Sequence, residues 1–272
     1  GEDFFGLVKE VKQLLKREKE SRAGGVVYLP NRGSAAVVGD VHGDLESLEF
    51  VLTHSEEDYM IFLGDYGDRG KDSPQVFCTL LRLKRDRPHQ FILLRGNHEP
   101  PPDLPVSPHN LPRLLEEGFE NGREIYRELS ELFQYLPYAA AVRGSYLFLH
   151  GGLPDVSSLE EVEMAQENHP KRPHLEQILW SDPMEDSGTG PSLRGAGRMF
   201  GKDVTQQVLD SLGVKTLIRS HEPCEGVRVD HDGKVVTVFS NKIYGNLKAA
   251  FLVVDLSRAE NGYELEERAI KF

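Results

Sequence analysis

Three short polar motifs contain side chains that commonly bind divalent metal ions. GDVHGD occupies residues 39–44, GDYGDRG occupies 64–70 and RGNHE occupies 95–99, and each follows an apolar run. Carboxylates, imidazoles and amide oxygens suit borderline divalent metals such as manganese, iron and zinc. The glycines on both sides allow the backbone to turn sharply and to approach an ion closely. These motifs predict a metal site built from separate turns.

Two histidines farther along the chain follow apolar runs in the same way. His150 ends SYLFLH, and His221 ends VKTLIRSH. Ligands of open α/β sheets bind beyond the carboxyl ends of the strands, so the polar residues of these turns should meet at one edge. One such motif is as often a simple turn or a buried core histidine, but five in one chain argue against coincidence. The residues expected to converge are Asp40, His42, Asp65, Asp68, Asn97, His98, His150 and His221.

The apolar periodicity predicts the elements that must position these turns. It favours helices over residues 3–20, 44–54, 73–86, 110–117, 120–135, 174–180 and 204–213. Short apolar runs favour strands over residues 34–39, 58–64, 89–96, 138–142, 145–149, 214–220, 226–240, 247–256 and 263–272. The HDGK segment within 226–240 indicates a hairpin. The proline-rich segment 100–108 excludes helix and central strand, so we expect a loop there.

The order of these elements predicts an α/β fold. Successive strand–loop–helix units in the first half favour a largely parallel sheet with right-handed crossovers. The last third is rich in strands and should be more antiparallel. No repeat or linker divides the sequence, so residues 1–272 are expected to form one catalytic domain.

The composition narrows the classes of partner. A net charge of −12 over 272 residues argues against nucleic acid, which requires concentrated positive charge. No apolar run approaches the roughly 20 residues of a membrane helix, and no leader resembles a signal peptide. Cys78 and Cys224 lack metal spacing and are too few for a disulfide framework. We therefore expect a cytoplasmic protein with reduced thiols, no nucleic-acid or membrane partner and no obligate protein partner.

The motifs GD-x-HG, GD-x-x-DRG, GNHE and HGG resemble those of the calcineurin-like metallophosphoesterase superfamily. Further stretches are similar to the PPP family of serine/threonine protein phosphatases, namely LWSDP (179–183), LRGAGRMFGKDV (193–204), IRSHE (218–222) and TVFSNKIYGN (237–246). The resemblance implies an α/β sandwich in which two mixed β-sheets pack face to face. Helices would flank the sheets, and the metal site would lie at the strand ends.

The resemblance also implies a role for each converging residue. The implied metal ligands are Asp40 and His42 for one ion, Asp65 as a bridge between both ions, and Asn97, His150 and His221 for the other. The implied cofactors are two divalent metal ions, manganese first, with iron or zinc as alternatives. His98, oriented by Asp68, would be the general acid that protonates the departing alkoxide.

Substrate contacts follow from the same resemblance. The implied substrate-binding residues are Arg69, Arg194, Asn97 and Tyr244. A guanidinium presents a fork of donors that suits phosphate oxygens. Without the motifs, Arg194 reads as a surface arginine and Tyr244 as an ordinary loop tyrosine. Asp182 and Glu99 match supporting positions, or serve as caps and core hydrogen-bond partners.

The implied activity is hydrolysis of phosphoserine or phosphothreonine in a phosphoprotein substrate, by in-line attack of a metal-bridging hydroxide. Two alternatives use the same scaffold: a dual-specificity phosphatase that also accepts phosphotyrosine, and a dinucleoside polyphosphate hydrolase. A non-catalytic binding module is a third alternative, although every ligand type is present.

Three departures from the family pattern bear on packing and substrate choice. Gly67 stands where the family usually has valine, and it should loosen the packing without affecting the ligands. Residues 100–108 replace a helical segment and should change the rim beside His98. SNKIYGN at 240–246 replaces SAPNYCGN, which leaves substrate choice and toxin sensitivity open. These departures indicate a prokaryotic or otherwise divergent member.

Overall fold

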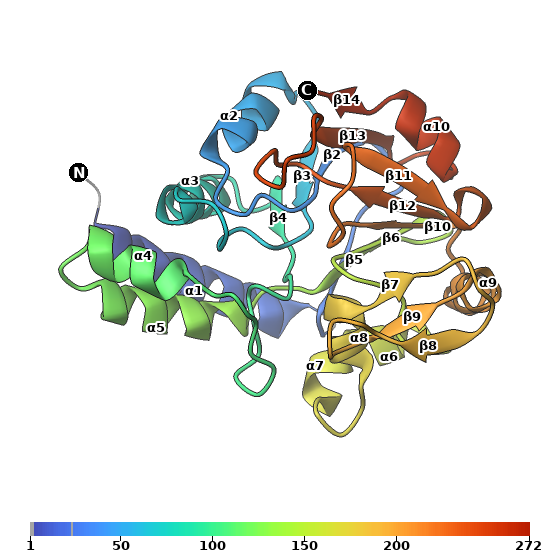
Figure 1. Ribbon diagram of the computed structural model, residues 1–272, viewed down its shortest axis with the longest axis horizontal. Helices are drawn as coiled ribbons and strands as arrows, with labels where there is room; N and C mark the ends of the chain where they lie inside the picture. Colours follow the sequence, from blue (N-terminus) through green and yellow to red (C-terminus); the bar gives the residue numbers. More distant parts are fainter. Residues whose placement is uncertain (1–2, 23) are drawn as a thin grey trace.

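The computed structural model describes residues 3–22 and 24–272. Helices and short strands follow one another along the chain (Figure 1). The helices are α1 (Phe4–Ser21), α2 (Leu45–His54), α3 (Ser73–Asp86), α4 (Leu111–Gly118), α5 (Gly122–Phe133), α6 (Leu159–Glu163), α7 (Ala165–Asn168), α8 (His174–Trp180), α9 (Lys202–Leu212) and α10 (Gly262–Glu267), with the 3₁₀ turn η1 (His231–Gly233).

The strands are short, and most of them are buried on both faces. They are β1 (Val26–Tyr28), β2 (Ser34–Val38), β3 (Tyr59–Phe62), β4 (Phe91–Leu93), β5 (Ala139–Val142), β6 (Tyr146–Leu149), β7 (Asp182–Pro183), β8 (Thr189–Pro191), β9 (Arg198–Phe200), β10 (Thr216–Arg219), β11 (Val227–Asp230), β12 (Val235–Val238), β13 (Ala250–Asp255) and β14 (Ile270–Lys271).

Two mixed β-sheets pack face to face, which confirms the predicted sandwich. One sheet has the order β1-β5-β6-β10-β12-β11, and the other has the order β14-β13-β2-β3-β4. Side chains alternate between the faces of each strand. Val37 and Ile61 therefore point from the second sheet into the same core as Phe148 and Ile218 from the first. This apolar layer holds the two sheets together.

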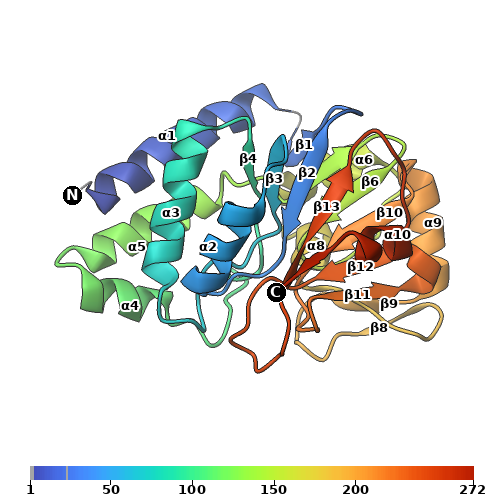
Figure 2. The ribbon, with the colours of Figure 1, turned by 90° about the horizontal axis from the view of Figure 1, so that it is seen from above.

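Helices cover the outer face of each sheet. Phe62 of β3 packs with Leu80 of α3 in one outer core. Leu147 of β6 packs with Leu209 of α9 in the other. Figure 2 shows α1, α3 and α5 on one side of the strands and α9 on the opposite side. None of the described helices is both long enough and apolar enough to cross a membrane.

The last third of the chain is more antiparallel than the first half, as expected, since β11–β12, β13–β14 and β13–β2 are antiparallel pairs, although β10 pairs parallel to both β6 and β12. It differs from the sequence prediction in two ways. Of the strand expected over residues 263–272, only Ile270–Lys271 forms one, and residues 263–267 lie in α10, because Asn261 and Glu264 make a capping box. A small third sheet, β7-β9-β8, lies in the polar stretch where no strand was expected. The predicted hairpin of β11 and β12 is confirmed.

Candidate metal centre and active-site cleft

The turns that carry the predicted ligands follow strands of both sheets. Asp40, Asp65 and Asn97 follow β2, β3 and β4, which run parallel in one sheet. His150 and His221 follow β6 and β10, which run parallel in the other. Because parallel strands end at one edge, the five turns meet there. The structure therefore brings together all the residues predicted as metal ligands, and none of them is more than 4% exposed.

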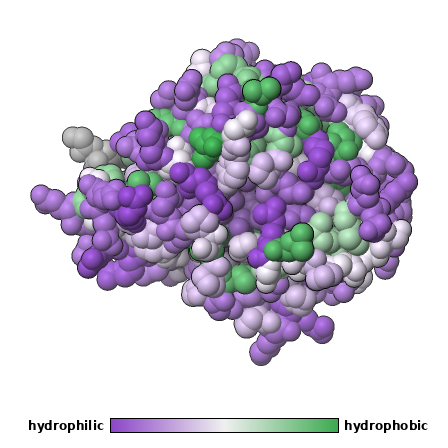
Figure 3. Space-filling view, viewed as in Figure 1, coloured by the Kyte–Doolittle hydropathy of each residue, from purple (hydrophilic) through white to green (hydrophobic). Residues whose placement is uncertain are grey.

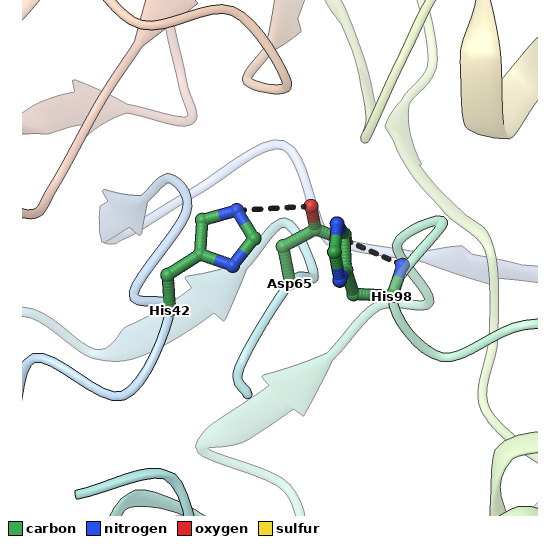
Figure 4. Close-up of side chains that lie close together, drawn as sticks. All are labelled: His42, Asp65 and His98. Atoms are coloured by element: carbon green, nitrogen blue, oxygen red, sulfur yellow. Dashed lines mark hydrogen bonds and ion pairs between the residues drawn. The ribbon is translucent and has the colours of Figure 1, made fainter. Parts of the chain in front are cut away.

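One group of ligand atoms surrounds the imidazole of His42. Its Nδ1 lies 2.8 Å from the carbonyl oxygen of Gly67, so Nδ1–H donates there and Nε2 keeps its lone pair. That Nε2 is 3.4 Å from Oδ2 of Asp40 and 3.4 Å from Oδ2 of Asp65. Figure 4 shows the ring directed at the Asp65 carboxylate, with His98 on the other side. A lone pair facing two carboxylate oxygens is an arrangement that a cation stabilises.

A second group of ligand atoms surrounds His150. Its Nδ1 lies 3.0 Å from the carbonyl oxygen of Leu63 and donates to it, which leaves a lone pair on Nε2. That Nε2 is 2.9 Å from Oδ1 of Asn97, 3.0 Å from Nδ1 of His221 and 3.4 Å from Oδ1 of Asp65. The Asn97 and Asp65 oxygens are acceptors that face this lone pair. In the described part of the chain Nε2 of His221 has no hydrogen-bond partner.

The side-chain amide of Asn97 faces His150, His221 and Asp65 in either of its two orientations. Turned over, its NH₂ would donate to His150, His221 and Asp65 at 2.9 to 3.2 Å. With the oxygen inward, a bound cation has to supply the positive charge instead. The residues present therefore fit a divalent metal ion, with nitrogen and oxygen ligands and no thiolate.

Burial sets the protonation of the centre. It lowers the pKa of His150 to about 3 and the pKa of His221 well below its ordinary value, so both imidazoles are neutral and able to ligate. Burial and the nearby charge of Asp40 raise the pKa of Asp65 well above its ordinary value. For Asp40, burial raises the pKa, but the contact with His42 and the charge of His150 outweigh it and lower the pKa.

The turn after β3 is held by Glu99 and by its own backbone conformation. The Glu99 carboxylate accepts hydrogen bonds from the backbone N–H groups of Asp65 (2.9 Å), Tyr66 (3.0 Å) and Gly96 (2.9 Å). The backbone N–H of His98 donates to Oδ1 of Asp65 at 2.9 Å, as drawn in Figure 4. Glu99 is fully buried, so the supporting role expected for it agrees with its contacts.

Left-handed backbone recurs at the site. Seven non-glycine residues have positive φ in the described part of the chain, and five of them lie in the ligand turns. They are His42 (48°), Asp65 (56°), Asp68 (65°), Arg69 (68°) and His221 (74°). Such angles are uncommon outside glycine and disfavoured by Cβ. The turns accept this strain while directing their side chains inward.

His98 and Asp68 form the predicted pair. Nδ1 of His98 lies 2.6 Å from Oδ2 of Asp68, so Nδ1–H donates to the carboxylate. The His98 ring also stands edge-on to His42, with centroids 4.8 Å apart, and it lines the cleft. Burial lowers the pKa of His98 to about 4, although the hydrogen bond that His98 donates to Asp68 acts in the opposite direction.

A cleft of about 270 Å³ opens above these side chains. Its lining includes all four predicted substrate-binding residues, Arg69, Arg194, Asn97 and Tyr244. Nε of Arg194 donates to Oδ2 of Asp182 at 2.6 Å, and Nη2 of Arg219 donates to Oδ1 of the same carboxylate at 2.7 Å. Asp182 thus aims Arg194 at the cleft. The face seen in Figure 3 is mostly hydrophilic, with scattered hydrophobic side chains.

The departures from the family pattern have specific structural outcomes. The expectation that Gly67 loosens the packing is wrong, because the ring edge of Phe77 stands 2.8 Å from the place of a Cβ there. The segment 100–108 is a loop, and its Val106 and Ser107 line the cleft. The ring of Tyr244, in the segment 240–246, lies 5.6 Å from that of His42.

Sequence reasoning missed three side chains at the site. Ser220 contacts Asp40, Trp180 lines the cleft, and His109 contacts Asp68. Ser220 directly precedes a predicted ligand, which is a signal that could have found it. His109 follows the proline-rich loop and has no such signal. Neither cysteine forms a disulfide, which agrees with the expected reduced thiols.

The chain is similar in sequence to known phosphatases. The family model described as calcineurin-like phosphoesterase matches residues 34–225. Serine/threonine-protein phosphatase T of Aspergillus oryzae is 34% identical over 271 residues, covering 92% of this chain and 54% of that protein. Human serine/threonine-protein phosphatase 5 is 37% identical over 223 residues, covering 76% of this chain and 43% of that protein. The chain thus spans about half the length of the curated relatives it matches.

Solved structures agree with the sequence matches. A protein serine/threonine phosphatase from Saccharomyces cerevisiae superposes with a TM-score of 0.79 and 26% identity, over 99% of this chain and 88% of that one. A cold-active protein-tyrosine phosphatase of a Shewanella species superposes with a TM-score of 0.57 and 16% identity, over 86% and 78%, and shares the fold. The match to the family model over most of the chain shows that the protein belongs to the calcineurin-like phosphoesterase family.

Proposed function

We propose that residues 1–272 form one catalytic domain that hydrolyses phosphoserine and phosphothreonine in proteins by two-metal catalysis. One observation carries the proposal: the two carboxylate oxygens of Asp65 face two different groups of ligand atoms. Oδ2 faces Nε2 of His42 and Oδ1 faces Nε2 of His150, each at 3.4 Å. A carboxylate shared in this way suits a pair of cations a few ångströms apart.

The metal ligands follow from the two groups. Asp40 and His42 would hold one ion, Asp65 would bridge, and Asn97, His150 and His221 would hold the other. When bound, two divalent ions supply Lewis acidity that activates water and neutralises phosphate charge. The family uses divalent metals, and the thiolate-free ligand set supports manganese, with iron or zinc as alternatives.

Two arginines would hold the phosphate. Arg69 and Arg194 line the cleft, and the Arg194 side chain is about one-third exposed, which leaves its guanidinium accessible to a ligand. Asp182 accepts from Nε of Arg194, and Nη2 makes a long contact of 3.4 Å with the carbonyl oxygen of His221. Nη1, and Nη2 on giving up that contact, would approach phosphate oxygens. The ring of Tyr244 would form the side of the cleft next to His42.

His98 would protonate the departing alkoxide. With Nδ1–H donated to Asp68, the free Nε2 is the atom that can carry the transferred proton. A serine or threonine alkoxide leaves poorly, so a positioned acid should accelerate its departure by about 10² to 10⁴. A phenolate leaves more readily and needs this acid less.

Names of relatives support the substrate class. The similar proteins from Aspergillus oryzae and human are called serine/threonine phosphatases, and phosphoproteins are the substrates that such names imply. The decisive experiment compares turnover of phosphoserine, phosphothreonine and phosphotyrosine peptides and a dinucleoside tetraphosphate, with manganese added. Asp65→Asn is the inactive control. Turnover of the dinucleotide but not of the peptides would contradict the proposal, and equal turnover of phosphotyrosine would make the enzyme dual-specific.

A further inference from the structure

His109 lies at the end of the loop between β4 and α4, and it contacts the same carboxylate oxygen as His98. Nδ1 of His109 and Nδ1 of His98 are each 2.6 Å from Oδ2 of Asp68. Asp68 is 0% exposed, and the His109 side chain is 18% exposed. One buried oxygen therefore accepts from two imidazoles, one near the start and one near the end of the connection between β4 and α4.

The residues next to His109 hold the same turn. The backbone N–H of Leu111 donates to Oδ1 of Asp68 at 2.8 Å, at the first turn of α4, where free N–H groups favour an anion. The side-chain oxygen of Asn110 accepts from the backbone N–H of Arg69 at 3.0 Å. Three consecutive residues thus bind the turn that carries Asp68 and Arg69.

Tyr126 of α5 fixes the orientation of the His109 ring. Its hydroxyl lies 2.6 Å from Nε2 of His109, and the two ring centroids are 5.4 Å apart. With Nδ1–H donated to Asp68, Nε2 accepts a hydrogen bond from the Tyr126 hydroxyl. The ring is therefore satisfied at both nitrogens in its neutral form. A continuous path of hydrogen bonds runs from α5 to the cleft: Tyr126, His109, Asp68 and His98.

We propose that His109 is a positioning residue that fixes the Asp68 carboxylate and, through it, the leaving-group acid His98. The inference rests on the proposed function, because it concerns protonation of the alkoxide. Asp68 stands in a left-handed turn with φ of 65°, and a carboxylate held by one fewer donor at Oδ2 can rotate. Nε2 of His98 would then leave the line of the departing oxygen, and small misplacements of a catalytic group slow reactions markedly.

The test measures rate against the acidity of the leaving group. His109→Ala and His109→Asn are compared with the unchanged protein on a phosphoserine peptide, phenyl phosphate, p-nitrophenyl phosphate and 2,4-dinitrophenyl phosphate. We expect His109→Ala to lower kcat on the phosphoserine peptide by about tenfold, a part of the whole acid contribution, with KM unchanged. The loss should vanish toward 2,4-dinitrophenyl phosphate. His109→Asn should restore most of the rate, because its amide N–H replaces Nδ1–H.

Controls separate positioning from folding and from metal binding. His54→Ala removes a histidine of α2 whose ring contacts the carbonyl oxygen of Phe50 in the same helix and stacks on the Phe50 ring. His54 is not among the residues that line the cleft, so this change should leave the rates unchanged. Metal content and thermal unfolding are measured for each variant. The inference is overturned if His109→Ala slows all the phosphate esters equally, if it reduces the number of bound metals, or if His109→Asn is no better than alanine.

A second readout needs neither metal nor substrate. In the metal-free protein, the two short N–H···O bonds to Asp68 should give two low-field imidazole proton resonances. Asp68→Ala should remove both, and His109→Ala should remove one and shift the other. An unchanged His98 resonance in His109→Ala would refute the positioning role. If the unchanged protein fails to turn over phosphoserine while these resonances behave as expected, then the proposed function fails and the hydrogen-bond path stands.

Discussion

The hydroxyl of Ser220 lies 2.5 Å from Oδ1 of Asp40, and the backbone N–H of Asp40 donates to the same hydroxyl oxygen at 2.8 Å. Asp40 follows β2 and Ser220 follows β10, so this reciprocal contact joins the two sheets where the metal ligands meet. The backbone N–H of His221 adds a third contact, at 3.0 Å from Oδ1 of Asp40. One proposed metal ligand, Asp40, is thus oriented by the opposite sheet.

Ser220→Ala should weaken both stability and metal binding. The change leaves the backbone N–H of Asp40 without its buried partner, which costs about 1 to 3 kcal/mol. It also removes one of the two donors to Oδ1 of Asp40, where only the backbone N–H of His221 remains. We expect a lower free energy of unfolding in urea and a weaker affinity for manganese by calorimetry. Ser257→Ala is the matched control, because that hydroxyl donates to Asp255 at 2.6 Å on the surface and should matter little. Equal effects of the two changes would refute the role of Ser220.

His98→Asn should separate proton donation from metal binding. His98 comes close enough to His42 and Asp65 to be considered a ligand, but its Nδ1 is taken by Asp68. We expect the variant to keep both metals and to hydrolyse phosphoserine peptides about 10² to 10⁴ times more slowly. Aryl phosphates should suffer less. Elemental analysis beside the kinetics checks this, and loss of a metal would show that His98 is a ligand.

Asp68 should contribute stability that acid removes. Burial raises the pKa of Asp68, but hydrogen bonds from His109 and His98 outweigh it and lower the pKa below that of the unfolded chain, about 3.9. The folded state therefore favours the carboxylate, so the contribution is complete above about pH 4 and fades as the pH falls below it. Urea unfolding of the metal-free protein should show the unchanged chain and Asp68→Asn converging in stability below pH 4. A gap that stays constant would contradict the lowered pKa.

Gly67→Val should destabilise the protein through Phe77. A Cβ at position 67 would lie 2.8 Å from the ring of Phe77 and 3.5 Å from Leu111. Overpacking of this kind costs about 1 to 3 kcal/mol. We expect Gly67→Val to lower the free energy of unfolding, and Phe77→Leu in the same chain to recover part of the loss. Additive effects of the two changes in a double-mutant cycle would show that the residues do not compete for space.

The turns that carry the proposed ligands were predictable because each lies within four residues of the end of a buried strand. An apolar run followed by Asp, Asn or His predicts a strand and places the polar residue at the carboxyl end of that strand. Asp40 and His221 could therefore be placed at the same edge from the sequence. His109 could not, because its partner Asp68 is far away in the chain and no motif joins them. Its position depends on how the loop before α4 returns to the turn after β3.

The mistaken elements have local causes. Residues 263–272 suggest a strand by composition, but the capping box of Asn261 and Glu264 begins a helix. Gly262 makes that helix possible, since a Cβ there would meet Val229 and Val236 at 2.8 Å. Strands β7 to β9 have two or three residues each, too few for an alternating pattern to be recognised.

The positive φ angles of the turns at the site imply that the site side chains are kept at a cost in the stability of the fold. Glycine adopts positive φ angles without penalty, so glycine at any of these five positions would remove backbone strain of about 1 kcal/mol or more. Glycine, however, brings no imidazole, carboxylate or guanidinium. A laboratory selection for heat tolerance that does not require turnover should therefore replace residues of these turns by glycine first. The first to change should be Arg69, which is exposed at the rim of the cleft.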